Sequence, residues 1–149
     1  MVRHTLKGAM MLMLVLTISL VARTANAQAQ HTQYANIPFD FVAGDKAMSA
    51  GRYRVAQMTP SGEAISVTNV ESSTAAIKLT NILVRTNPAV QSKLVFHRYG
   101  NTYFLSEIWR AGENNGRMIR KSSQEKAAEQ QLAANRKSFQ RVEVATARD

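Results

Sequence analysis

Residues 93–110 read KLVFHRYGNTYFLSEIWR, and this stretch decides the fold class. Two runs rich in apolar, aromatic and β-branched residues flank the dipeptide Gly100-Asn101. A glycine at the first position of a two-residue loop accepts the positive φ angle that tight hairpin turns require. The stretch therefore predicts a β-hairpin.

The sequence leaves two registers open for this hairpin. A two-residue loop places Arg98 opposite Tyr103, whereas a three-residue loop places Lys93 opposite Glu107. Both faces of the hairpin carry apolar residues, so the apolar pattern does not choose between the two registers.

Further strands are expected on the N-terminal side of the hairpin. Apolar and polar residues alternate within residues 37–42, 52–56 and 65–68, and residues 75–84 are rich in β-branched residues. Turn-forming residues separate the segments at intervals of about ten residues, which predicts a small antiparallel β-sandwich or barrel of about six or seven strands. Pro38 has no amide hydrogen, so the first strand is expected at a sheet edge or with Pro38 among its first residues.

The last part of the chain has a different character. Residues 112–122 are polar and carry Asn115-Gly116, so we expect a loop with this dipeptide at its tip. Ser122 begins a capping box and good helix formers follow, which predicts a C-terminal helix over residues 123–138. Residues 139–149 are expected to form a tail or a short strand.

The N-terminal segment has the pattern of a secretory signal peptide. Arg3 and Lys7 precede an apolar run of about 15 residues, which as a helix is shorter than the 30 Å core of a bilayer. Small residues at Ala25 and Ala27 suit a signal peptidase, so we expect cleavage after Ala27 or, alternatively, after Ala29. Without a twin-arginine pair, the general secretory route to the periplasm or the extracellular space is expected, with no transmembrane anchor after cleavage. An uncleaved N-terminal anchor is the alternative.

The composition limits the chemistry and the partners that we expect for this chain. The chain contains no cysteine, which excludes disulfides, thiol catalysis and cysteine-ligated metals. After the leader, we expect a flexible segment over residues 28–35 and one antiparallel β domain over residues 36–111. Residues 28–149 contain 16 basic and 10 acidic residues, a net charge of +6 that favours anionic partners. For an exported protein these are lipid head groups or polysaccharides, and nucleic acid is not expected.

No catalytic motif is present in the sequence. His97 and Glu107 point to opposite faces in one hairpin register and lie roughly 13 Å apart in the other, so they predict no acid–base pair. We interpret His97 as a half-buried strand histidine stacked on an aromatic side chain. No metal-ligand spacing or cofactor motif is present, so neither a metal nor a cofactor is expected. A small hydrolase or lyase that pairs His97 with a carboxylate from another strand is the alternative.

Two groups of residues are candidates for binding. Aromatic side chains on a sheet can line a ligand site, and the candidates for this role are His97, Tyr103, Trp109 and Phe41. Basic residues of the C-terminal region could contact anionic lipid or polysaccharide, and the candidates are Arg117, Arg120, Lys121, Arg136 and Lys137. The preferred hypothesis is an exported, non-enzymatic β-domain that binds a ligand or a partner in the cell envelope.

Two blocks of the sequence, NIPFDFVAGDKAMSAGRYRV (residues 36–55) and KLVFHRYGNTYFLSEIW (residues 93–109), resemble a group of small exported bacterial β-rich proteins. Members of the group share I-P-F-x-F, G-D-K, A-G-x-Y-x-V and F-H-x-Y-G-x-x-Y-F-L-S-x-x-W. Met48 and Ser49 stand where this pattern leads us to expect leucine and proline. The resemblance implies an exported β-rich domain and brings no catalytic residue, because no activity is assigned to the group.

Overall fold

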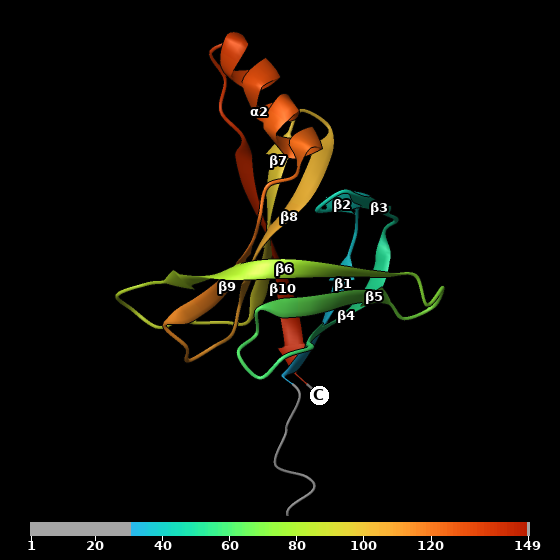
Figure 1. The fold of residues 1–149 in the computed structure, drawn as a ribbon, viewed down its shortest axis with the longest axis vertical. Helices are drawn as coiled ribbons and strands as arrows, with labels where there is room; N and C mark the ends of the chain where they lie inside the picture. Colours follow the sequence, from blue (N-terminus) through green and yellow to red (C-terminus); the bar gives the residue numbers. More distant parts are fainter. Residues whose placement is uncertain (1–30, 149) are drawn as a thin grey trace, which may run out of the picture.

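The structure is a computed structural model that describes residues 31–148, so the expected signal peptide lies outside the described residues. The prediction of a mainly β fold with a C-terminal helix is confirmed (Figure 1). The strands are β1 Thr32–Ile37, β2 Phe41–Ala43, β3 Lys46–Met48, β4 Gly51–Gln57, β5 Ala64–Asn69, β6 Ala75–Val84, β7 Lys93–Tyr99, β8 Thr102–Trp109, β9 Asn115–Ile119 and β10 Gln140–Arg148, and the helix is α2 Ser123–Ala134.

Eight of these strands close an antiparallel barrel. The hydrogen-bonded order is β1–β4–β5–β6–β9–β8–β7–β10, and β10 pairs with β1 to complete the ring. The short strands β2 and β3 form a hairpin that joins β8 through the parallel pair Val42 and Phe104. The strand count exceeds the predicted six or seven, because short strands such as β3 and β9 carry little sequence signal.

The hairpin of β7 and β8 has the two-residue loop, with Arg98 opposite Tyr103 and Gly100 at φ 62. A bulge between Val95 and Phe96 then shifts the pairing, so that Val95 lies opposite Glu107. This shift corrects the expectation that the two-residue loop places His97 and Glu107 on opposite faces. Because of the bulge, His97 and Glu107 lie on the same, outer face of the barrel.

Strand β1 corrects two predictions. The segment expected to be flexible already contains a strand from Thr32, and Gln33 and Ala35 are buried. Pro38 does not mark a sheet edge, because β1 ends just before it and lies between β4 and β10. The polar appearance of residues 32–35 hides this strand, because only every second residue of a strand faces the core.

Strand β9 lies where a loop was predicted over residues 112–122. Gly116 pairs with Leu83 of β6, so the dipeptide Asn115-Gly116 is part of a strand and not the tip of a loop. A Cβ atom at Gly116 would lie 2.8 Å from the ring of Trp109. The glycine is therefore required by close packing, a reason that local turn propensity does not reveal.

The C-terminal elements follow the sequence signals more closely. Ser122 caps α2 and its hydroxyl accepts a hydrogen bond from the amide of Glu125 at 3.2 Å. The helix ends at Ala134, earlier than the predicted residue 138. Of the two alternatives for the last residues, the strand is confirmed, because β10 lies between β7 and β1 and closes the barrel.

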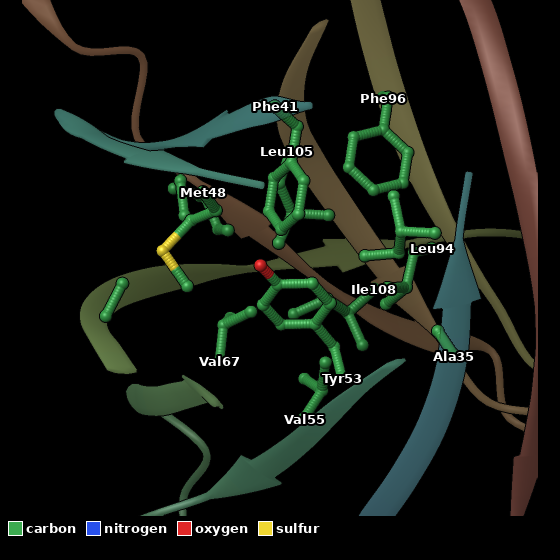
Figure 2. Close-up of a cluster of buried hydrophobic side chains, with 14 of the residues drawn as sticks. Ala35, Phe41, Met48, Tyr53, Val55, Val67, Leu94, Phe96, Leu105 and Ile108 are labelled. Carbon is green, nitrogen blue, oxygen red and sulfur yellow. The ribbon is translucent and has the colours of Figure 1, made fainter. Parts of the chain in front are cut away.

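The barrel is filled by side chains over most of its length. Buried residues from nine strands, β1 to β9, meet in its core, as Figure 2 shows for Phe41, Tyr53 and Phe96. The ring of Phe41 packs edge-on against both other rings, with centroids 5.0 and 5.4 Å apart.

Candidate binding site at the barrel mouth

The four aromatic and histidine candidates do not share one site. Phe41 is 2% exposed and belongs to the core, whereas Tyr103 stacks on Phe39 with ring centroids 4.0 Å apart. Trp109 is fully buried on the outer face of the barrel, beneath the guanidinium of Arg85 at 4.1 Å. These contacts leave no common surface on which the predicted residues could hold a ligand.

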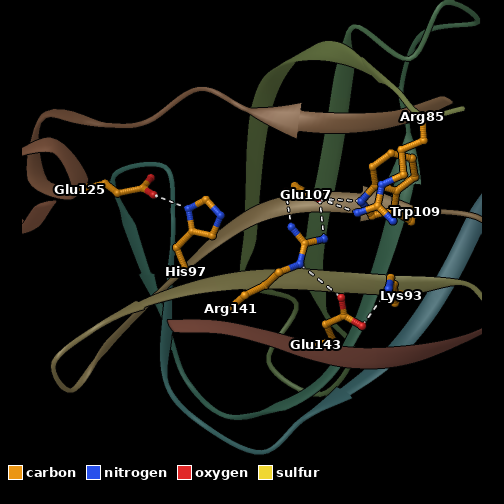
Figure 3. A network of polar contacts seen from close by, with 8 residues as sticks. All are labelled: Arg85, Lys93, His97, Glu107, Trp109, Glu125, Arg141 and Glu143. Atoms are coloured by element: carbon orange, nitrogen blue, oxygen red, sulfur yellow. Dashed lines mark hydrogen bonds and ion pairs between the residues drawn. The ribbon is translucent and has the colours of Figure 1, made fainter. Parts of the chain in front are cut away.

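His97 has a carboxylate neighbour that the sequence did not indicate. Its Nδ1 atom lies 3.4 Å from Oε1 of Glu125, which comes from α2 and not from another strand (Figure 3). The hydroxyl of Tyr99 donates to the same oxygen at 3.2 Å. Phe139 stacks on the imidazole with ring centroids 4.1 Å apart, as expected for a half-buried strand histidine.

This cluster joins α2 to the barrel. Glu125 is 3% exposed, and Ala128 and Leu132 of the helix pack against Tyr99 nearby. Burial, together with the negative charge of Glu125, raises the pKa of Tyr99 far above its usual value. The phenol therefore stays protonated and continues to donate to Glu125. Since Phe139 and the helix cover the imidazole, the arrangement suits a structural contact better than an exposed acid–base pair.

Glu107 is the centre of a second polar cluster on the outer face (Figure 3). Both of its oxygens accept hydrogen bonds from Arg141, and Oε2 also accepts one from Nε1 of Trp109 at 2.6 Å. Burial alone would raise the pKa of Glu107, but the hydrogen bonds from Arg141 and Trp109 and the charges of Arg141 and Arg85 outweigh it and lower the pKa. The carboxylate is thus fully partnered, which fits a structural role.

The basic candidates are spread over the molecule. Arg120 and Lys121 follow β9 and contact Asn81 and Glu129, and Arg136 and Lys137 lie in the turn after α2. Arg117 lies on β9 and donates to the carbonyl of Ser61. The five residues therefore form no single anion-binding surface, and only Arg117 reaches the cavity described next.

A cavity of 130 Å³ opens at one end of the barrel. Its apolar wall is formed by Val55, Ile65 and Ile108, which are core residues near the ends of β4, β5 and β8. Gln33 and Arg117 contribute polar groups. The strands position these residues, because the inward-facing positions of neighbouring strands converge at the mouth of a barrel.

The polar side of the cavity carries more positive than negative charge. Arg110 is paired with Glu113 at 3.0 Å, whereas Arg117 has no ion pair with a carboxylate of residues 31–148. Gln33 is 4% exposed, and its Oε1 accepts a hydrogen bond from Thr146 at 2.8 Å. An apolar wall beside an arginine and a buried amide is suited to an amphipathic anion.

The sequence contains an indirect signal for one residue of the cavity, Gln33. Gln33 is in phase with Ala35 and Ile37, both of which face the core. A polar residue at an inward position of a strand is a signal for a polar site or a barrel end. The polar composition of residues 28–35 hides this signal, because it is typical of a flexible terminus.

A larger but shallower groove of 560 Å³ lies along β2 and β3 and includes Phe41 and Met48. Within residues 31–148, no group of three or more histidine or acidic side chains could hold a metal ion. The one described helix is too short and too polar to cross a membrane.

No protein-family model, curated protein or solved structure matches this chain.

Proposed function

We propose that the protein is an exported binding domain that holds a small amphipathic anion in the mouth of its barrel. The observation that carries this proposal is the 130 Å³ cavity, where apolar core residues meet Arg117 and the buried amide of Gln33. The signal-peptide pattern of the N-terminal segment and the resemblance to small exported bacterial proteins support the export part of the proposal.

The size of the cavity limits the ligand. A dry protein cavity of about 150 Å³ is known to hold one benzene molecule, so this site suits an apolar body of about six non-hydrogen atoms whose charged group lies at the open mouth. The wall formed by Val55, Ile65 and Ile108 favours an apolar body. Arg117 favours a carboxylate, which a guanidinium can bind through two parallel hydrogen bonds. A small aromatic or short-chain carboxylic acid meets these requirements.

The first experiment is native mass spectrometry of the full chain expressed with its own leader and recovered from the periplasm. We expect a mass that begins at Gln28, with a small retained adduct. The full-length mass in the cytoplasmic fraction alone would contradict export. A cleaved and empty protein would leave the binding proposal to the titration described next.

The second experiment is a calorimetric titration with benzoate, hexanoate and inorganic phosphate. For ligands of this size we expect a dissociation constant of about 10 μM to 1 mM for the two carboxylates and weaker binding of phosphate, which has no apolar body. Arg117→Gln should weaken benzoate binding about tenfold, because it removes a charge-assisted contact. The matched control is Arg120→Gln, which removes the same charge just after the same strand.

The binding proposal fails if neither carboxylate binds, or if both arginine variants weaken binding equally. Equal weakening would indicate general electrostatic attraction to a basic protein rather than a site at the barrel mouth.

A further inference from the structure

The outer face of β1, β4 and β5 carries a group of polar side chains unrelated to the cavity. These strands are neighbours in the barrel (Figure 1). Alternate residues point inward, so the others point to solvent. The outward residues that are partly or fully exposed are Thr32, Tyr34 and Asn36 on β1, Arg52 and Arg54 on β4, and Ala64, Ser66 and Thr68 on β5. We call this set the β1–β4–β5 face.

Strand pairing places its polar groups side by side. Tyr34 lies opposite Arg54, and Asn36 lies opposite Arg52. Thr68 lies opposite Arg54 on the other side. Paired residues on neighbouring strands are about 5 Å apart and successive outward residues about 7 Å apart, so these groups form a compact array.

Tyr34 orients one of the two arginines. The guanidinium carbon of Arg52 lies over the Tyr34 ring, 5.4 Å from the ring centroid. Such stacking restricts the long side chain, yet leaves the N–H groups at the edge of the guanidinium free to donate. Arg52 is thereby prepared to bind an anion at a smaller entropic cost than a mobile arginine.

The charges of this face are not balanced within it. The β1–β4–β5 face contains no carboxylate, and neither Arg52 nor Arg54 forms an ion pair with an acidic residue of the described chain. Acidic residues elsewhere in the described chain, such as Glu107 and Glu143, already pair with other arginines or lysines. Two unpaired guanidiniums on one flat surface attract a ligand with repeated negative charges.

We propose that the β1–β4–β5 face binds an acidic polysaccharide. The two guanidiniums would pair with carboxylates of the sugar chain, and the hydroxyls of Thr68 and Ser66 and the amide of Asn36 would bond its hydroxyl groups. This site is on the outside of the barrel and does not depend on the cavity at the mouth.

Three features favour a polysaccharide over other polyanions. Within these three strands Tyr34 is the only large apolar side chain that points outward, and the exposed Ile77 and Leu79 lie beyond them on β6, beside Ser66 and Ala64 rather than beside the arginines. It has no row of exposed aromatic rings on which bases could stack, which proteins that bind single-stranded nucleic acid use. The proposed export of the protein also removes it from most nucleic acid. The polysaccharide, by contrast, uses both the charges and the hydroxyl and amide groups between them.

The test uses the full mature chain and a hexamer of galacturonic acid as the probe, with maltohexaose as an uncharged probe of equal length. Binding is followed by calorimetry at low and high salt. We expect the acidic hexamer alone to bind, with an affinity that falls as salt rises. Arg52→Gln and Arg54→Gln should each weaken binding about tenfold.

Two further variants separate a built site from general attraction. Tyr34→Leu keeps the net charge but removes the ring that orients Arg52, and it should weaken binding several-fold. The double variant Arg136→Gln/Lys137→Gln removes two charges from the exposed turn after α2 and should leave binding nearly unchanged.

The proposal would be overturned if the variants at Arg52 and Arg54 weakened binding no more than the Arg136→Gln/Lys137→Gln variant. It would also be overturned if Tyr34→Leu left the affinity unchanged. Binding to vesicles of phosphatidylglycerol but not to the hexamer would overturn it as well. Because benzoate binding at the mouth is measured separately with Arg117→Gln, failure of either proposal is distinguishable from failure of the other.

Discussion

Arg141 of β10 and Glu107 of β8 form two hydrogen bonds of 2.8 and 2.9 Å across the intervening strand β7. Neighbouring strands lie about 4.8 Å apart, so this pair ties together backbones roughly 10 Å apart. Beneath it, Val95 of β7 is fully buried. The ion pair therefore fastens the C-terminal strand onto the outer face of the barrel.

Removing the charge of Glu107 should destabilise the protein strongly. Glu107→Gln removes the buried carboxylate that pairs with Arg141 and leaves this arginine only the more exposed Glu143, and breaking a buried pair costs about 3 kcal/mol. Urea unfolding measures the difference. The control is Glu143→Gln, which removes an acid from the same network at a more exposed position and should cost less than about 1 kcal/mol. Similar losses for both variants would contradict a special role for Glu107.

Stability should also fall in acid. The pKa of Glu107 is lowered for the reasons given above. The pKa of Glu143 is also lowered, because the hydrogen bonds and charges of Lys93 and Arg141 outweigh the effect of burial, which alone would raise it. Lowered folded-state values mean that the unfolded chain takes up protons first as the pH falls. The stabilisation is therefore complete above the unfolded value of about 4.3 and is lost as the pH drops through the folded values.

The measurement is the free energy of unfolding between pH 3 and pH 7. We expect a steep loss below about pH 4 in the wild type and a shallower one in Glu107→Gln, which cannot lose that charge. Identical pH profiles for the two proteins would show that Glu107 does not contribute to the acid sensitivity.

Gly116 should not tolerate a side chain. In Gly116→Ala the new Cβ atom would lie 2.8 Å from the ring of Trp109, in a part of the structure held by Arg85 and Val95. Forcing a methyl group into such packing costs about 2 kcal/mol and should shift the fluorescence of the single tryptophan. Gly100→Ala is the control, because nothing lies within 4 Å of its Cβ position. It should cost about 1 kcal/mol, from the positive φ alone, and leave the fluorescence unchanged.

Glu125 should control how firmly α2 docks on the barrel. Glu125→Ala removes the acceptor of the buried Tyr99 hydroxyl and the neighbour of His97, and an unpaired buried group costs about 1 to 3 kcal/mol. We expect faster amide hydrogen exchange in α2 and little change in β4 and β5. Glu129→Ala, which removes a half-exposed acid one turn later, should leave the exchange nearly unchanged. Faster exchange throughout the barrel would show that the cluster supports the whole fold instead.

Local sequence signals predicted the elements whose structure depends on neighbouring residues. Gly100-Asn101 marked the hairpin loop, Ser122 marked the start of α2, and residues 75–84 formed β6 with the predicted bounds. In each case the chemistry that directs the chain lies within a few positions: a glycine with a positive φ, a capping hydroxyl or a run of β-branched side chains.

Other features depend on residues far apart in the chain. Local sequence predicts a turn at Asn115-Gly116 and not a strand, because Trp109 contacts Gly116 only once β8 and β9 pair. His97 gained Glu125 as a neighbour only through the docking of α2, and the bulge that turned Glu107 outward has no local sequence signature.

The sequence by itself thus determined a β-rich chain with a C-terminal helix, the position of the turn in its central hairpin, and the absence of cysteine chemistry. Only the tertiary structure decided that β10 returns to pair with β1, that eight strands close, and that Gln33 and Arg117 meet at one mouth. The physical reason is that periodicity reports which face of a strand is buried. Which strands become neighbours depends on how all the buried faces pack together.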